Sequence, residues 1–163
     1  MSELTQEKLK GLFHYDPETG IFTRKFSHAR HKAGMQAGYE MTDGYHVIGI
    51  NRKYHMIHRL AWLYMYGEFP DGFIDHINGE RDDNRICNLR IVTPRENCEN
   101  LKLPTIASTT GYLGVMFDKR RNKYIAKIQV NYKQIHLGEF NEPEVAYEAY
   151  LAAKRKYHSG CTI

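Results

Sequence analysis

The chain has 163 residues, of which 42% are hydrophobic and 12% aromatic, a composition typical of folded protein and long enough for one ordinary domain or two small ones. The longest apolar run without a charge, residues 60–67, is too short to span a bilayer, and the polar N-terminus shows no signal peptide. Three cysteines that never form a Cys-x-x-Cys pair argue against a disulfide framework and a cysteine zinc site, and they fit a reducing cytoplasm.

The formal net charge of +4 is unevenly placed along the chain. Residues 1–100 hold 13 Lys and Arg against 14 Asp and Glu, whereas residues 101–163 hold 10 against 5. We therefore expect the last third of the chain to be the part that meets a polyanion.

Residues 1–57 predict a β-rich lead-in. A short helix is expected over residues 4–13, followed by a turn over residues 16–20 that contains Asp, Pro and Gly. The predicted strands are 20–25, 44–50 and 53–57, with a tight turn at 51–53 between the last two.

The next segment alternates short strands and helices. Apolar residues at helical spacing predict a helix over 57–66, which Gly67 and Pro70 end. Strands follow at 73–76 and 89–92, on either side of a polar loop. Thr93 is expected to cap a helix through Leu101, with Glu96 completing a capping box.

Residues 105–163 predict a three-stranded sheet with one helix packed across it, after a Ser/Thr-rich linker at 105–111. Asn141 is expected to cap the helix, which runs from Glu142 to about Tyr157. The predicted strands are 112–117, 123–130 and 133–140, and the apolar stripe of the helix is Ala146, Ala149, Tyr150, Ala153 and Tyr157.

Four polar residues in this order suggest chemistry: Asp75-His76, then Asn88, then Asn97. An imidazole can deprotonate a water, and carboxylate and amide oxygens can hold a hard divalent cation. Adjacent strand residues point to opposite faces, so the set requires Asp75 and His76 to lie at the end of their strand. Taken singly, each residue also fits an ordinary turn, cap or surface position.

Residues 58–100 closely resemble the HNH endonucleases of phage and intron-encoded type, which have the ββα-metal fold. The matching text is His58-Arg59-Leu60, Asp75-His76-Ile77-Asn78-Gly79, Asn84-Arg85-Ile86-Cys87-Asn88-Leu89 and Thr93-Pro94-Arg95-Glu96-Asn97. The resemblance implies that His76 is the general base and that Asn88 braces the loop and the histidine. It also implies that Asp75 and Asn97 bind one divalent cation, Mg²⁺ first and Mn²⁺ as the alternative, in preference to zinc.

The predicted C-terminal sheet has a polar outer face. Strand alternation places Lys127 and Gln129 on that face, together with Gln134 and His136 of the next strand. The turn residues Lys119, Arg120 and Arg121 add a cationic edge. Such a face could enter a DNA major groove, and a solvated sheet face fits the pattern equally well.

Residues 108–158 are similar to the AP2 DNA-binding domain, a module of three strands and one helix. The matching text is Gly111-Tyr112-Leu113-Gly114-Val115, Tyr124-Ile125-Ala126-Lys127-Ile128, Leu137-Gly138-Glu139-Phe140 and Glu144-Val145-Ala146-Tyr147-Glu148-Ala149-Tyr150. The resemblance implies DNA contacts at Leu113, Met116, Lys127, Gln129, Gln134 and His136. Leu113 and Met116 depart from the arginine and tryptophan usual in plant members, so no target sequence carries over.

The sequence thus predicts an α+β protein with a lead-in at 1–57, an HNH nuclease core at 58–104 and an AP2-like domain at 105–163. The expected function is a site-preferring, homing or phage type, metal-dependent DNA endonuclease that nicks or cuts both strands. We expect it to act on double-stranded DNA as a monomer or weak homodimer, with no membrane, in the cytoplasm of a bacterial host and encoded by a phage or mobile element. The alternatives are a non-catalytic, sequence-specific DNA-binding regulator with a relic HNH motif, and an RNA-binding module.

Overall fold

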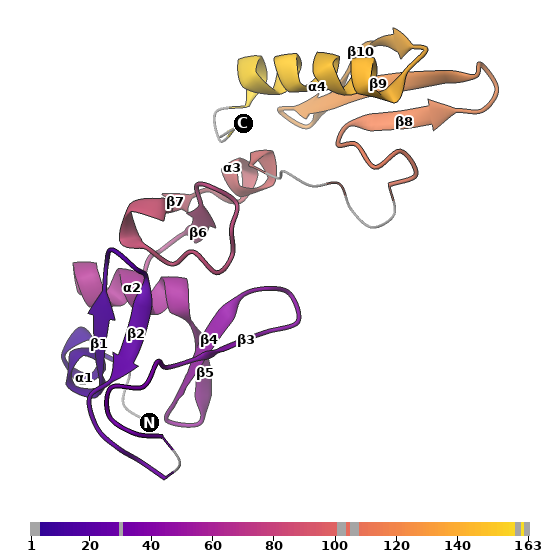
Figure 1. Ribbon diagram of the computed structural model, residues 1–163. Coiled ribbons are helices and arrows are strands. Elements are labelled where there is room, and N and C mark those ends of the chain that lie inside the picture. The colour runs from indigo at the N-terminus through magenta and orange to yellow at the C-terminus, as the bar shows by residue number, and fades with distance from the viewer. Residues whose placement is uncertain (1–3, 30, 101–103, 105–107, 159–160, 162–163) are drawn as a thin grey trace. The chain divides into compact units, whose positions relative to one another are not determined.

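The computed structural model describes residues 4–29, 31–100, 104, 108–158 and 161 (Figure 1). The chain forms two compact units, Met1–Thr93 and Pro94–Ile163. Several small antiparallel sheets and four α-helices make up the described part of the chain, which confirms the predicted α+β class. The three-domain division at residues 57 and 104 stays a prediction.

The first unit begins with a helix and a hairpin. Helix α1 (Gln6–Leu12) starts at the N-cap Thr5, whose hydroxyl accepts a hydrogen bond from the Lys8 amide at 3.4 Å. Strands β1 (Phe13–Asp16) and β2 (Ile21–Arg24) pair antiparallel across a turn. The predicted helix end at Phe13 is wrong by one residue, because Phe13 and Tyr15 alternate into the core as the buried positions of a strand.

A three-stranded sheet and a helix follow. Strands β3 (Tyr39–Glu40), β4 (His46–Ile50) and β5 (Lys53–Met56) lie in the order β3-β4-β5, and β5 runs directly into α2 (Ile57–Tyr66). Gly67 ends α2 at φ 91°, a left-handed conformation that favours glycine. These bounds confirm the predicted helix at 57–66 and the strand pair around the 51–53 turn.

Strands β6 (Phe73–His76) and β7 (Leu89–Val92) have the predicted bounds, and they pair as a two-stranded antiparallel sheet. The connection between them ends in the short 3₁₀ helix η1 (Ile86–Asn88). Helix α3 (Pro94–Glu99) comes next in the chain and belongs to the second unit. The predicted helix extends to Leu101, whereas α3 ends at Glu99 and Asn100 is a turn; Leu101 lies outside the described residues.

One apolar core joins the lead-in to the β6–β7 hairpin. Residues from α1, β1, β2, β4, α2, β6 and β7 all contribute to it, so residues 1–57 are packed into the same unit as the predicted nuclease segment. Its buried members are Leu9, Phe13, Tyr15, Phe22, Ala37, Ile48, Ile50, Ile57, Leu60, Ala61, Leu63, Ile74 and Leu89.

The second unit contains a sheet of β8 (Val115–Asp118), β9 (Lys123–Val130) and β10 (Lys133–Phe140), in the order β10-β9-β8 (Figure 1). Helix α4 (Pro143–Tyr157) packs on this sheet. The predicted Asn141 cap is wrong by one position, since Glu142 is the N-cap and Pro143 the first helical residue.

The buried stripe of α4 differs in part from the predicted one. Ala146, Tyr150 and Ala153 are buried against the sheet, as expected from their spacing. Tyr157 is 39% exposed, and Lys154 is buried on the helix instead. Within the described part of the chain, every helix is too short or too polar to cross a membrane.

Ala146→Leu should destabilise the second unit by about 1–3 kcal/mol, because the larger side chain has no room at a position that is fully buried against Val115 and Ala126. Ala152→Leu is the matched control on the exposed side of the same helix. Urea unfolding of both variants measures the difference, and equal stability would show that the α4–sheet contact is not tightly packed.

Candidate functional site

Asp75 and His76 lie at the end of β6, where the sequence requires them to be. Both are buried, with exposed fractions of 8% and 4%. In the antiparallel register Asp75 is opposite Arg90 and His76 is opposite Leu89. The two side chains contact different groups, Asp75 reaching Arg90 and His76 reaching Asn84.

His76 is held by a side chain of the following loop. Its Nε2 lies 3.4 Å from Oδ1 of Asn84, and the amide nitrogen of Asn84 donates to the Asp82 carbonyl at 2.8 Å. Because an amide oxygen can only accept, this contact selects the tautomer in which Nε2 carries the hydrogen and Nδ1 carries the lone pair. Burial lowers the pKa of His76 below its ordinary value, which favours the neutral imidazole at pH 7.

A second histidine packs against the first. The rings of His58 and His76 meet edge to face at 5.2 Å between centroids, and Tyr45 lies 5.5 Å from His58 and 6.0 Å from His76. Burial, together with the nearby His76 and Arg59, lowers the pKa of His58 to about 3. The Nδ1 atom of His58 is buried without a hydrogen-bond partner among the described residues.

The lead-in segment supplies the Tyr45 wall of this cluster. The guanidinium of Arg81 lies 5.0 Å from the centroid of the Tyr45 ring, and Arg81 also donates to the Asp43 carbonyl at 2.6 Å. A turn between β3 and β4 is thereby tied to the loop after β6. The predicted nuclease segment therefore does not form the histidine environment alone.

Asn88 ties the two ends of the β6–β7 loop together. Its Oδ1 accepts from the Asn78 amide at 3.0 Å, and its Nδ2 donates to Asn78 Oδ1 at 2.9 Å and to the Asp83 carbonyl at 2.8 Å. Its own carbonyl accepts from the Ile77 amide at 2.9 Å. A forked ion pair between Arg85 and Asp83 at 2.6 Å adds to this network and, with its hydrogen bonds, lowers the pKa of Asp83 to about 2.

Asp75 already has a cationic partner. Nε and Nη2 of Arg90 donate to the same oxygen of Asp75, Oδ2, at 3.0 Å and 2.8 Å. Asn97 lies on α3 in the second unit, so its predicted role as a second metal ligand stays a prediction. Within the described residues no three His, Cys, Asp or Glu side chains cluster as a metal site.

The predicted DNA-contacting residues lie on β9, β10 and the β8–β9 turn, except Met116, which lies on β8, and Leu113, which precedes β8. Lys127 is opposite His136 and Gln129 is opposite Gln134, so the four share one sheet face, as the alternation predicts. Gln129, Gln134 and His136 are exposed, and Lys127 is half-buried.

The three cations of the β8–β9 turn differ in their surroundings. Lys119 and Arg120 are exposed, whereas Arg121 forms ion pairs with Glu139 of β10 and Asp118. The charge of Arg121 is thus offset within the unit, which the sequence pattern did not indicate. Lys119 and Arg120 are the more available cations of the turn.

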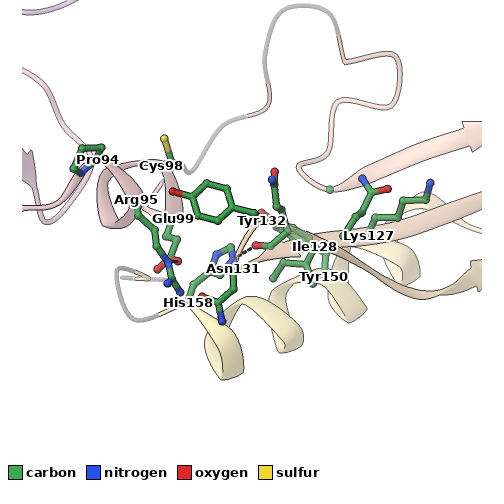
Figure 2. A pocket seen from close by; sticks show the side chains of 13 residues that line it. Pro94, Arg95, Cys98, Glu99, Lys127, Ile128, Asn131, Tyr132, Tyr150 and His158 are labelled. Atoms are coloured by element: carbon green, nitrogen blue, oxygen red, sulfur yellow. Dashed lines mark hydrogen bonds and ion pairs between the residues drawn. The ribbon is translucent and has the colours of Figure 1, made fainter.

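A pocket of about 550 Å³ lies within the second unit, lined by α3 and the β9–β10 hairpin together with part of α4 (Figure 2). Arg95 of α3 pairs with Glu99 at 2.7 Å, and His158 forms a hydrogen bond with the Gln129 carbonyl at 2.8 Å. Lys127, Gln129 and Gln134 also line this pocket. The pocket belongs to a different unit from His76 and Asp75.

The chain is similar to known proteins in the segment that contains these residues. Residues 55–98 match the family described as HNH endonuclease. This segment is thus similar to the HNH endonucleases, in agreement with the resemblance seen in the sequence. This match ends at residue 98, so the AP2 resemblance of residues 108–158 stays a prediction.

Three curated proteins are similar in sequence to part of this chain. YosQ, named as an SPbeta prophage-derived HNH homing endonuclease of Bacillus subtilis (strain 168), is 38% identical over 82 residues, covering 49% of this chain and 47% of YosQ. Protein 3.8 of Escherichia phage T7 is 33% identical over 78 residues, 47% of this chain and 64% of that protein. The DNA endonuclease I-HmuI of Bacillus phage SP01 is 38% identical over 63 residues, 36% of each.

The chain spans about half the length of the curated relatives that it matches, from 36% to 64%. A solved structure of I-HmuI, titled as DNA binding and cleavage by the HNH homing endonuclease, matches with a TM-score of 0.46 at 21% identity. That likeness covers 98% of this chain and 95% of the other.

Four residues that contact the predicted site have no assigned role in the motif reading: Asn84, Arg90, Tyr45 and Tyr15. The contact between Arg90 and Asp75 could have been predicted from the sequence, because an antiparallel register between the two predicted strands places these residues opposite each other. Asn84 carries no such signal, since asparagine is common in polar loops. Tyr15 and Tyr45 come from the lead-in and are brought to the loop only by folding.

The unfolding free energy should fall as the pH drops below 6.5, because the pKa of His58 in the folded chain is about 3 whereas its ordinary value is 6.5. Between pH 3 and pH 6.5 the His58 side chain binds a proton in the unfolded chain and not in the folded one. The stabilising contribution of the neutral His58 is therefore complete above pH 6.5, and it decreases toward pH 3 by up to about 1.4 kcal/mol per pH unit.

His58→Phe keeps an aromatic ring and removes the titratable group, so the unfolding free energy of this variant should depend less steeply on pH over the same range. Urea unfolding at a series of pH values measures both slopes. The exposed His14 provides the control His14→Phe, which should keep the wild-type slope. Equal slopes for His58→Phe and the wild type would show that His58 is not held neutral by folding.

Proposed function

We propose that this protein is a metal-dependent DNA endonuclease with site preference, of homing or phage type. The observation that carries the proposal is the environment of His76, a buried imidazole that contacts Asn84 and whose burial favours the neutral form, within a segment that matches the HNH endonucleases. A positioned neutral imidazole is what a general base for water requires at pH 7.

His76 would remove a proton from the attacking water. Nδ1 is the nitrogen with the lone pair in the tautomer that Asn84 selects, so the proton would move to that atom. Asn88 would act indirectly, because its bonds to Asn78 and Asp83 hold the loop that carries Asn84. Phosphodiester hydrolysis then needs neutralisation of the negative transition state and of the leaving oxygen.

A divalent cation supplies that neutralisation when bound. The Asp75 carboxylate and the Asn97 amide oxygen are the proposed ligands, and a donor set of hard oxygens suits Mg²⁺ or Mn²⁺. Asp75 fits the role because it is a buried carboxylate fixed in orientation by Arg90. Arg90 would also limit the net negative charge of the site before the cation binds.

The second unit would anchor the enzyme to double-stranded DNA through the AP2-like sheet. The exposed Gln129, Gln134 and His136, with Lys127, offer donors to a groove, and Lys119 and Arg120 offer charges to phosphates. The residues 101–163 carry the excess of basic side chains in the chain, which supports this division of roles.

His76→Ala should reduce nicking or cutting of a supercoiled plasmid with Mg²⁺ by about a hundredfold or more, because it removes the base. His14→Ala, an exposed histidine of the same unit, should leave the rate unchanged. Undiminished cleavage by His76→Ala would remove His76 from the chemistry. Wild-type protein that binds DNA without cutting it would support the alternative, a DNA-binding regulator with a relic motif.

Asp75→Asn should abolish the calorimetric uptake of Mn²⁺ by the protein, because the amide keeps an oxygen for Arg90 and loses the charge that a hard cation needs. The control Asp71→Asn changes an exposed aspartate of the same unit and should bind Mn²⁺ like the wild type. Unchanged uptake by Asp75→Asn would refute this ligand.

Replacing Lys119 and Arg120 together by Ala should weaken DNA binding and make the slope of log K against log salt less negative by about 1.8, or roughly 0.9 for each lost phosphate contact. Arg121→Ala should change the slope by less than the roughly 0.9 expected for one phosphate contact, since Arg121 is already paired with Glu139. Fluorescence anisotropy with a labelled duplex at several salt concentrations measures both. An unchanged slope in the double variant would show that this turn does not meet the phosphates.

A further inference from the structure

The segment Tyr15-Asp16-Pro17-Glu18-Thr19-Gly20 connects β1 and β2, and the proposed nuclease function leaves it without a role. The turn is fixed from within. The Asp16 carboxylate accepts from the Glu18 amide at 3.0 Å and from the Thr19 hydroxyl at 2.9 Å, and the Gly20 amide donates to the Asp16 carbonyl at 2.8 Å. It is therefore a preformed shape that can set the position of whatever packs on it.

What packs on it is the backbone of the β6–β7 loop. The Tyr15 hydroxyl donates to the Asn84 carbonyl at 2.7 Å, across 69 positions of sequence, and the Ile86 amide donates to the Pro17 carbonyl at 3.3 Å. A Cβ added to Gly20 would lie 2.5 Å from the carbonyl carbon of Asn84 and 2.6 Å from the Arg85 nitrogen. Only glycine allows this approach, and its φ of 73° is left-handed as well.

The side chain of Tyr15 is held in one position by the core, so its hydroxyl is a fixed hydrogen-bond donor. Tyr15 is 2% exposed, its ring is 4.6 Å from that of Phe22 and 5.6 Å from that of Tyr64, and all three belong to or pack against the main core. Its hydroxyl is the polar end of an otherwise apolar contact, and burial raises its pKa well above the ordinary value, so it stays a donor.

The residue held in this way is the one that contacts His76. Asn84 is 4% exposed, and its side chain bridges the Asp82 carbonyl and His76 Nε2. We propose that the β1–β2 turn, through Tyr15 and Gly20, is a positioning element that clamps residues 84–86 and thereby keeps the His76 ring in its Nε2-protonated tautomer. The proposal rests on the proposed function for its kinetic consequence, and not for the tautomer.

The test compares matched pairs of variants in the full chain without added metal. Gly20→Ala and Gly34→Ala place a Cβ at similar left-handed φ values, 73° and 81°, but only at Gly20 would that Cβ meet other atoms. Tyr15→Phe and Tyr64→Phe each remove one hydroxyl from the same aromatic cluster, and only that of Tyr15 donates to Asn84. Asn84→Ala, which removes the direct contact, is the positive reference.

Long-range ¹H–¹⁵N correlation spectra of the His76 ring report its tautomer directly. The wild type, Gly34→Ala and Tyr64→Phe should show hydrogen on Nε2, whereas Gly20→Ala, Tyr15→Phe and Asn84→Ala should show a mixture. In plasmid cleavage with Mg²⁺, kcat should fall about tenfold in Gly20→Ala, Tyr15→Phe and Asn84→Ala, while KM should change by less than about twofold. The reason is that positioning of the base acts on the chemical step.

If Tyr15→Phe has the His76 spectrum and the kcat of the wild type, the proposed clamp is wrong. This conclusion holds even if Gly20→Ala does not fold. A change in Gly34→Ala equal to that in Gly20→Ala would overturn it as well, since general destabilisation would then explain both. Absence of cleavage by the wild type would instead overturn the proposed function, and the spectra would still decide the clamp.

Discussion

The structure of the first unit depends on satisfying the buried amides of one irregular loop. Asn84 and Asn88 are buried, with exposed fractions of 4% and 6%, in a segment without a long helix or strand to use up polar groups. An unpaired buried amide costs a free energy of about 1–3 kcal/mol. Asn88 meets this requirement inside the loop, and Asn84 meets it through His76, Asp82 and Tyr15.

This requirement links the lead-in to the predicted base. Because the carbonyl of Asn84 is bonded to Tyr15 and its side chain to His76, a displacement of the β1–β2 turn reaches the imidazole through one residue. Tyr45 and Arg81 make a second link from the lead-in to the same histidines. The β-rich N-terminal segment is thus a structural part of the histidine environment, and burial in that environment favours a neutral ring.

Two local charge arrangements accompany this geometry. Asp75 is held by Arg90, so the buried carboxylate is not left uncompensated, which would otherwise be strongly unfavourable. In the second unit Arg121 is offset by Glu139, while Lys119 and Arg120 stay exposed. Of the three cations in the β8–β9 turn, one is therefore offset within the unit and two face solvent.

The local elements and the motif could be predicted from the sequence. Helix α2, strands β6 and β7 and the sheet of β8 to β10 follow from apolar periodicity and turn residues, and the motif around Asp75, His76 and Asn88 carried the resemblance to the HNH endonucleases that the family match supports. The contact of Asn84 with His76, and the contacts of Tyr15 and Gly20 with residue 84, could not be predicted and depend on the folded structure. The physical reason is that periodicity reports contacts a few residues apart, whereas these contacts join segments up to 69 positions apart and exist only once a shared core forms.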